Sequence, residues 1–333
     1  MTRYALALAA ASLLSGGSVV AQAGSTLPLR QQQSVLTEEA VVPLDEARVL
    51  TWSSPAPDAI NAHIVRAPDG LVLFDTLRRS DQTENLIRVL DDLGGAPKAI
   101  LITHAHTDHY GGLSFVRERY GAVPVHGTEA IQDEIRDDVY PDNARRRAMF
   151  GARFPTQETI DRHLPTELAK DGEPFEVAGL KVVPLAMGGS ESPAAVVYHL
   201  PELNAAIVGD LVNVLTVSAP TVSLDGWLGQ LDRLEEALPS DTTLYVGHGP
   251  SGPAAPLIAD QRDYLVTLRD LVIGAAADDE GVTAAETDSI VRTMRLAYPH
   301  HRGAAFLPPE ALIAESVGWV AQQIAVGDDA DGR

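Results

Sequence analysis

The sequence predicts an α/β fold in which two β-sheets form one sandwich. Its first half alternates apolar strand patterns with amphipathic helical patterns, as α/β domains do. A second β-rich stretch of similar size follows a long polar segment, which indicates a second sheet. The chain has 333 residues, 45% of them apolar, so it can bury a full hydrophobic core.

The first β-rich stretch, at about residues 49–75, is expected to contain a β-hairpin. Two alternating apolar runs flank the turn sequence APDG. Helical spacing follows at residues 81–95, and KAILITH is typical of a buried strand. After it we expect a helix in GGLSFVRERYG, a strand in VPVHG and a helix in TEAIQDEI, for which Thr128 is the N-cap.

Periodicity breaks down at about residues 136–167, where polar residues dominate. Insertions of this length in compact domains are usually lids or binding loops, so we expect a long functional loop with one short helix. The second set of strands comprises FEVAGLKVVPLA, AAVVYHL, NAAIVGD and TLYVGHG. From about residue 254 the chain is expected to be helical, and residues 24–333 to form a single domain.

Residues 1–23 have the pattern of a secretory signal peptide. Arg3 gives a short basic start, an apolar stretch too short to span a bilayer follows, and Ala21-Gln22-Ala23 resembles a cleavage site. We therefore expect a periplasmic or secreted protein. No later apolar run has membrane-spanning length, so no membrane insertion is expected once the signal is removed.

The composition limits which partners are expected and which residue types can bind a metal. A formal net charge of -21 repels phosphate backbones, so we expect a small-molecule substrate and no nucleic acid. The sequence has no cysteine, so it has no disulfide, and any metal must be held by nitrogen and oxygen ligands alone.

Four residues of metal-ligating types follow the strand ILIT within six positions. His104, His106, Asp108 and His109 form the pattern H-x-H-x-D-H, where a strand ends and a glycine-assisted helix begins. Alternate residues of a tight turn can face one ion while Asp108 and His109 reach a second. Imidazole and carboxylate ligands suit Zn²⁺. The alternative is a surface histidine cluster or a set of hydrogen-bonded core histidines, but four such residues at this spacing are a far more specific signal than two.

Two further candidate ligands end apolar strands later in the chain. Asp210 ends AAIVGD, where an unpaired buried carboxylate would be costly, and His248 ends TLYVGHGP between glycines. Sites in α/β layers lie at the carboxyl ends of strands, so Asp210 is expected to bridge two ions and His248 to complete the second. The alternatives are a helix N-cap for Asp210 and a turn residue for His248.

These motifs resemble the metallo-β-lactamase-fold hydrolases over essentially the whole chain after residue 23. THAHTDHYGG, the VGD aspartate and the GHGP histidine have the order and approximate spacing of that family. The resemblance implies an αββα sandwich of two mixed sheets, with a dinuclear site, usually zinc, on one edge. It also implies that Asp75, in LVLFDT, contacts the metal ligands without binding the metal itself.

One position departs from the family pattern. The family usually supplies a histidine before a VVY strand, and here Glu191 in GGSESPAAVVYHLPE takes its place. We expect Glu191 to ligate the first ion, because a carboxylate binds zinc at a distance similar to imidazole. The alternative is a solvated loop glutamate. The alkylsulfatase-like branch resembles this chain here, in FDTLRR and in DNARRRAMFGARFP, although its full-sized members have further C-terminal domains.

The long polar segment supplies candidate substrate contacts. Arg146, within the run Arg145–Arg147, would contact an anionic group of the substrate, as the alkylsulfatase resemblance suggests. Phe150 and Phe154 would form an apolar wall beside it. The alternatives are a solvated helix face for the arginines and core packing for the phenylalanines.

The resemblance therefore implies an exported hydrolase with two Zn²⁺ ions per chain, with Mn²⁺ or Fe²⁺ as alternatives. Hydroxide on the metal would attack a small or amphiphilic ester, sulfate ester, lactone or lactam. Asp108 and Asp210 are the expected catalytic residues, with either Asp108 or metal-bound water as acid toward the leaving group. A β-lactamase is one specific alternative, and a mononuclear iron oxygenase or a non-catalytic metal-binding protein of the same fold is another.

Overall fold

The computed structural model describes residues 48–55, 59–139, 141–276, 281–304 and 306–330. All of them belong to one compact unit that spans residues 41–333. The signal peptide predicted over residues 1–23 lies outside the described residues. Within the described part, no helix combines the length and the hydrophobicity that a membrane span requires.

The first sheet is mixed, with strand order β1-β2-β3-β4-β5-β6. The first three strands are antiparallel, and β3 to β6 are parallel to one another. The expected hairpin is β2–β3, closed at the pair Ala67↔Gly70. The strands are β1 (Arg48–Ser53), β2 (Asn61–Ala67), β3 (Gly70–Phe74), β4 (Ala99–Leu101), β5 (Val125–Gly127) and β6 (Glu167–Leu168).

The second sheet is also mixed, with strand order β12-β11-β10-β9-β8-β7. Only β10 and β11 are parallel among its neighbouring pairs. The strands are β7 (Phe175–Val177), β8 (Leu180–Ala186), β9 (Val196–Leu200), β10 (Ala205–Gly209), β11 (Thr243–Val246) and β12 (Gly252–Pro253).

Strand β10 is buried on both faces, which explains its unbroken apolar sequence AAIVG. Side chains alternate between the faces of a strand. Ala205 and Ile207 join the core cluster that includes the strands of the first sheet, while Ala206 and Val208 join a second core with the C-terminal helices. The second sheet therefore packs on the first sheet with one face and on helices with the other. This arrangement confirms the predicted αββα sandwich of two mixed sheets.

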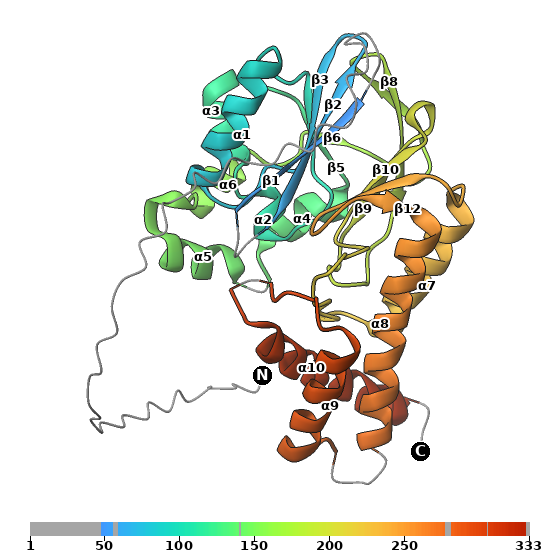
Figure 1. The fold of residues 1–333 in the computed structure, drawn as a ribbon. Coiled ribbons are helices and arrows are strands. Elements are labelled where there is room, and N and C mark those ends of the chain that lie inside the picture. Colours follow the sequence, from blue (N-terminus) through green and yellow to red (C-terminus); the bar gives the residue numbers. More distant parts are fainter. Residues whose placement is uncertain (1–47, 56–58, 140, 277–280, 305, 331–333) are drawn as a thin grey trace, which may run out of the picture. The chain divides into compact units, whose positions relative to one another are not determined.

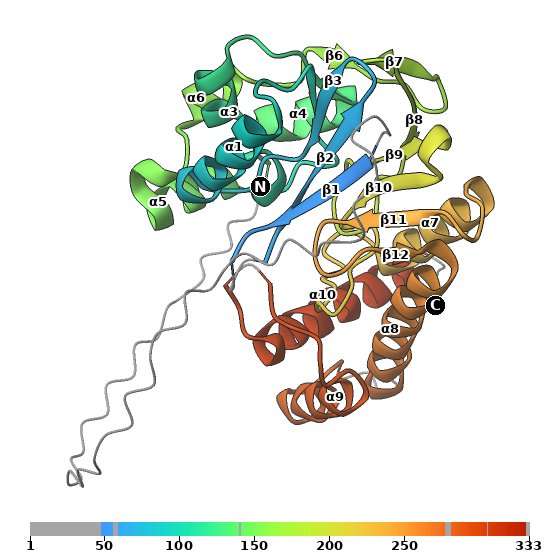
Figure 2. The ribbon, with the colours of Figure 1, turned by 45° about the horizontal axis from the view of Figure 1, so that its top comes forward.

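Helices cover both outer faces of the sandwich. Figures 1 and 2 show α1 and α3 beside the first sheet, and α7 and α8 beside the second. The helices are α1 (Ser80–Leu93), α2 (Thr107–Tyr110), α3 (Leu113–Tyr120), α4 (Glu129–Asp137), α5 (Asp142–Phe150), α6 (Gln157–Asp161), α7 (Leu224–Ala237), α8 (Ala254–Ala275), α9 (Ala284–Ala297) and α10 (Pro309–Ala330), with 3₁₀ turns η1 (Gly151–Arg153) and η2 (Pro201–Leu203).

The segment at residues 136–167 is more regular than the expected loop with one short helix. It contains α5, the turn η1 and α6, and it leads into β6. In α5 the buried side chains are Asn143, Arg146 and Phe150, so only one of the three is apolar. A helix that buries so little apolar surface has no hydrophobic periodicity from which it could be predicted.

The turn between α2 and α3 is packed backbone to backbone against the turn after β3. A Cβ atom at Gly112 would lie 2.0 Å from the carbonyl oxygen of Thr76 and 2.2 Å from Thr83 Oγ1. Gly112 N also donates a hydrogen bond to Leu77 O at 2.8 Å. This position therefore has no room for any side chain.

We expect Gly112→Ala to lower the free energy of unfolding by about 2 kcal/mol or more, because overpacking here must displace backbone. Urea unfolding of the chelator-treated protein measures the effect without a contribution from bound metal. Gly229→Ala in α7 is the matched control: nothing lies within 4 Å of its added Cβ, so it should leave stability unchanged or slightly higher. Equal unfolding midpoints for the two variants would contradict the packing argument.

Candidate metal centre

The predicted ligands meet where strands of both sheets end. His104 and His106 lie in the turn between β4 and α2, and Asp108 and His109 lie in α2 itself. From the second sheet, Asp210 follows β10, and His248 comes two residues after β11. Three short stretches that are distant in sequence thus supply all six side chains.

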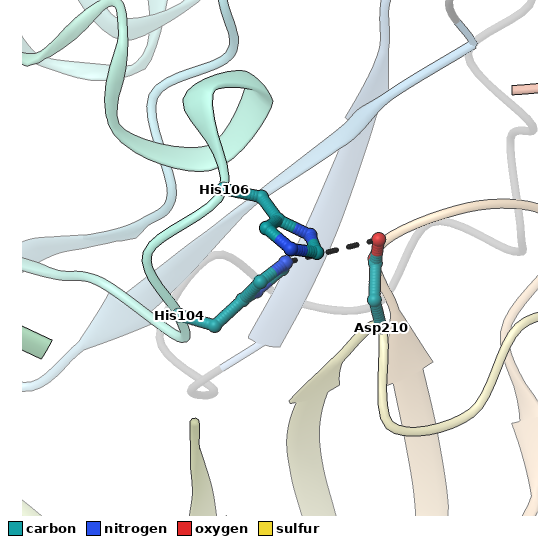
Figure 3. A group of neighbouring side chains, drawn as sticks. All are labelled: His104, His106 and Asp210. Carbon is teal, nitrogen blue, oxygen red and sulfur yellow. Dashed lines mark ion pairs between the residues drawn. The ribbon is translucent and has the colours of Figure 1, made fainter. Parts of the chain in front are cut away.

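Three of these residues form the first ligand group, His104, His106 and Asp210. One ligand atom from each lies within 4.8 Å of the others. Figure 3 shows the two imidazoles from the turn after β4 facing the carboxylate from the end of β10. His104 Nε2 is 3.8 Å from Asp210 Oδ2.

Asp108, His109 and His248 form the second ligand group, with ligand atoms equally close together. His248 Nε2 lies 3.3 Å from Asp108 Oδ2, and His109 Nε2 lies 3.8 Å from the same oxygen. All three residues are buried, with exposed fractions of at most 8%. Nitrogen and oxygen atoms 3.3 to 3.8 Å apart can bind one ion at about 2 Å from each.

Asp210 lies between the two groups. Its Oδ1 is 3.4 Å from His109 Nε2, and its Oδ2 is 3.4 Å from His248 Nε2. Gly247 packs directly against Asp210 and His109. A Cβ atom at residue 247 would lie 2.0 Å from Asp210 Oδ1 and 2.8 Å from His109 Cε1, so a side chain there would displace both. The glycine before His248 is thus required for the approach of β11 to the centre.

The hydrogen bonds around the imidazoles fix which nitrogen faces the centre. Thr103 Oγ1 donates to Asp75 Oδ2, so its contact with His104 Nδ1 at 3.0 Å makes that nitrogen the donor. His109 Nδ1 likewise donates to Asp75 Oδ2 at 2.8 Å. In both rings Nε2 is then the atom available to a metal.

The inner atoms of the centre are buried and unsatisfied. Within the described residues, His104 Nε2, His109 Nε2 and Asp210 Oδ1 have no hydrogen-bond partner. Buried polar atoms normally have partners, and orphaned nitrogen and oxygen atoms within the two ligand groups fit bound cations. The nitrogen and oxygen donor set fits a borderline divalent ion such as Zn²⁺.

The electrostatics of the centre also favour a cation. Burial lowers the pKa of His104 well below its usual value, and burial lowers the pKa of His106, so both imidazoles are neutral donors. Burial alone would lower the pKa of His248, but Asp210 and Asp108 raise it to about 10. The carboxylates thus attract protons to the second group, and a metal ion would displace them.

Glu191 lies at the edge of the first ligand group, in the loop between β8 and β9. Its Oε1 is 3.8 Å from His106 Nδ1, and its Oε2 accepts a hydrogen bond from Asn213 Nδ2 at 3.1 Å. Burial and the charge of Asp210 raise its pKa well above the usual range. The side chain is 16% exposed and faces the centre, unlike a solvated loop glutamate.

The two predicted substrate contacts are both buried in α5. Arg146 is 8% exposed, and its Nε has no hydrogen-bond partner among the described residues. Burial and the neighbouring charge of Arg78 lower its pKa. The ring of Phe150 lies 5.2 Å from that of Phe306, centre to centre, and Phe154 is fully buried. Phe150 and Phe154 therefore belong to the hydrophobic core.

Sequence reasoning missed the partners that hold the ligands in place. Arg78 Nη2 lies 2.9 Å from Asp108 Oδ2, and Asn213 holds Glu191. Burial alone would raise the pKa of Asp108, but Arg78 and the neighbouring imidazoles hold it well below its usual range. The only sequence signal near Arg78 was the stretch FDTLRR, which was noted for its resemblance to the alkylsulfatase-like branch and not for any role of the arginine.

The fold and the centre together define an αββα protein with a candidate metal site at the ends of strands from both sheets. A family model described as the metallo-beta-lactamase superfamily matches residues 55–249. The chain belongs to this superfamily, which confirms the resemblance seen in its motifs.

Known proteins similar to this chain include two curated hydrolases. It is 25% identical over 197 residues to "probable metallo-hydrolase YqgX" of Bacillus subtilis, covering 58% of this chain and 87% of the relative. It is 28% identical over 180 residues to a linear primary-alkylsulfatase of a Pseudomonas species, covering 45% of this chain but 26% of the relative.

Among solved structures, a metallo-beta-lactamase family protein of Thermus thermophilus matches with a TM-score of 0.58 at 21% identity. The match covers 84% of this chain and 94% of that protein. At this identity the similarity establishes the fold alone.

Proposed function

We propose that this protein is an exported metal-dependent hydrolase with two divalent ions, zinc by preference. The observation that carries the proposal is the pair of ligand groups, each with three ligand atoms within 4.8 Å. In this proposal His104, His106, Asp210 and Glu191 hold the first ion. Asp108, His109 and His248 would hold the second, and Asp210 would contribute to both sites.

Bound divalent ions supply Lewis acidity that activates water for attack on an ester-like bond at neutral pH. The protein's own residues keep the site ready for this chemistry. His104 and His109 present Nε2 because Thr103 and Asp75 hold their Nδ1 atoms. Asp108 is ionised beside Arg78, so it would first accept a proton and then pass it to the leaving group, with a water molecule as the alternative donor.

The proposed substrate is a small or amphiphilic ester, sulfate ester, lactone or lactam, and the alkylsulfatase similarity favours a sulfate ester. Arg146 supports an anionic substrate, because a buried guanidinium whose Nε has no hydrogen-bond partner among the described residues gains from an anionic ligand. We therefore expect anionic substrates to be preferred over neutral ones of the same size.

A substrate panel with the zinc-loaded protein tests the proposal. The panel comprises dodecyl sulfate, 4-nitrophenyl sulfate, 4-nitrophenyl acetate, an acyl-homoserine lactone and nitrocefin. We expect turnover of at least one, lost with a chelator and restored by zinc. The absence of metal-dependent turnover on every substrate, or one iron per chain in place of two zinc ions, would favour the non-hydrolytic alternatives.

Export is supported by the basic, apolar and small-residue pattern at residues 1–23. We expect the mature chain of an exporting host to begin at or near Gly24. Mass spectrometry of the exported protein measures this, and recovery of intact Met1 outside the cytoplasm would contradict it.

Asp75 is expected to be needed for tight metal binding, although it is not a ligand. Its Oδ2 holds His109 Nδ1 and the hydroxyl of Thr103, each at 2.8 Å. We expect Asp75→Asn to weaken zinc binding about 10- to 100-fold, as loss of such partners does elsewhere. Competition with a chromophoric chelator measures the affinity.

The control is Asp81→Asn, which removes a surface carboxylate paired with Arg79. It should leave zinc affinity unchanged. Affinity of Asp75→Asn within threefold of wild type would show that the hydrogen bonds of Asp75 do not support the centre.

A further inference from the structure

We infer that Arg78 makes the second ligand group a much weaker metal site than the first, so that the two ions bind with unequal affinity. This inference rests on the proposed metal function and specifies how the two sites differ. It follows from the position of one buried cation.

Arg78 is held inside the protein at the second ligand group. Its side chain is 2% exposed, and its Nη2 lies 2.9 Å from Asp108 Oδ2. Its guanidinium carbon lies 5.1 Å from the centre of the Phe306 ring, a cation–π distance. The arginine is therefore packed on one side by an aromatic ring and on the other by a candidate metal ligand.

The oxygen that Arg78 contacts is the one that faces the imidazoles. Asp108 Oδ2 also lies 3.3 Å from His248 Nε2 and 3.8 Å from His109 Nε2. A cation in the second group must share this oxygen with the guanidinium. Two positive charges beside one carboxylate oxygen repel each other, which weakens the binding of the second charge.

The backbone near Arg78 is fixed relative to this turn. Thr76 N donates to His109 O at 2.7 Å, and Gly112 N donates to Leu77 O at 2.8 Å. A Cβ at Gly111 would lie 2.5 Å from Arg78 O, so the two turns are in direct contact. Arg78 therefore stays beside Asp108 unless the packing of both turns changes.

The first ligand group has no such competing cation. Within the described residues, every ion-pair partner of Asp210 and Glu191 is a histidine. Asp210 lies beside both sites, so the difference rests on the other carboxylate of each site: Glu191 at the first has no arginine partner among the described residues, whereas the charge of Asp108 at the second is offset by Arg78. In a buried site this difference in charge favours the first ion strongly.

Stepwise zinc titration of the full metal-free chain tests the inference. Isothermal titration, combined with chelator competition for the tighter ion, yields both Kd values. We expect the second Kd of the wild type to exceed the first by at least about 100-fold. Arg78→Met should lower the second Kd at least about tenfold and leave the first within about threefold, because it removes the competing charge but keeps an apolar stem.

Two variants separate charge from packing. Arg78→Lys keeps the positive charge and should keep the second site weak. Arg79→Met, the matched control, changes a neighbouring arginine that pairs with Asp81 away from Asp108, and should leave both Kd values unchanged.

Equal Kd values in the wild type, or an unchanged or higher second Kd in Arg78→Met, would overturn the inference. If Arg78→Met does not fold, the wild-type titration and Arg78→Lys still decide the question, because equal affinities in either would contradict it. A wild type that binds no zinc would contradict the proposed function itself, whereas two equally tight ions would contradict only the role of Arg78.

Discussion

Replacing Asp210 with asparagine is expected to remove both metal binding and hydrolysis. Asp210 lies 3.4 Å from both His109 Nε2 and His248 Nε2 and belongs to the first ligand group. Its loss removes a charge from both sites at once. Loss of a residue that only holds a ligand in place reduces metal affinity by up to about 100-fold. We therefore expect Asp210→Asn to lower zinc affinity and turnover by more than about 100-fold.

Metal content of the purified variant, measured by mass spectrometry, and turnover of the best panel substrate check this prediction together. Asp241→Asn is the control, since it removes an exposed carboxylate from the chain just before β11. Circular dichroism shows whether each variant folds. A folded Asp210→Asn protein that keeps two zinc ions and wild-type turnover would exclude Asp210 as a bridge.

Glu191→Gln is expected to release the first ion preferentially, and turnover should fall with it. The variant preserves size but removes the charge that faces His106 Nδ1 at 3.8 Å. Glu191→His restores the family ligand and should retain metal. Because it leaves one more positive charge at the centre, the attacking water ionises more readily and the activity profile should shift to lower pH.

Metal content and pH–rate profiles of the two variants test this role. Glu173→Gln, at a surface carboxylate paired with Lys170, is the control and should behave as wild type. If both Glu191 variants bind two equivalents of zinc and keep wild-type rates at every pH, Glu191 is not a ligand. That result would also weaken the assignment to the alkylsulfatase-like branch.

Local sequence patterns determined the elements of the fold and most of the centre. The H-x-H-x-D-H motif lies in the turn after β4 and in α2, so its spacing alone predicts that its side chains lie close together. Asp210 and His248 were predictable because each follows a buried strand, and strand ends gather at one edge of a sheet. The apolar run of β10 likewise predicted a strand, and the structure shows that both of its faces are buried.

Segments with few apolar residues gave weaker predictions of secondary structure. Helix α5 buries two polar residues and Phe150, so its periodicity was weak and the segment was expected to be mainly loop. Phe150 was considered as a substrate contact because sequence cannot distinguish a pocket wall from a core residue. The structure shows that its ring packs against Phe306 from a distant part of the chain.

Only the tertiary structure decided which charges meet at the centre. Arg78 and Asp108 are thirty positions apart, in turns that come together because β3 and β4 pair in parallel and end at the same edge. Asn213 reaches Glu191 across two loops of the second sheet. Residue types and local spacing determine which ligands are available, but long-range packing sets the distances between charges, and Coulomb energy depends on those distances.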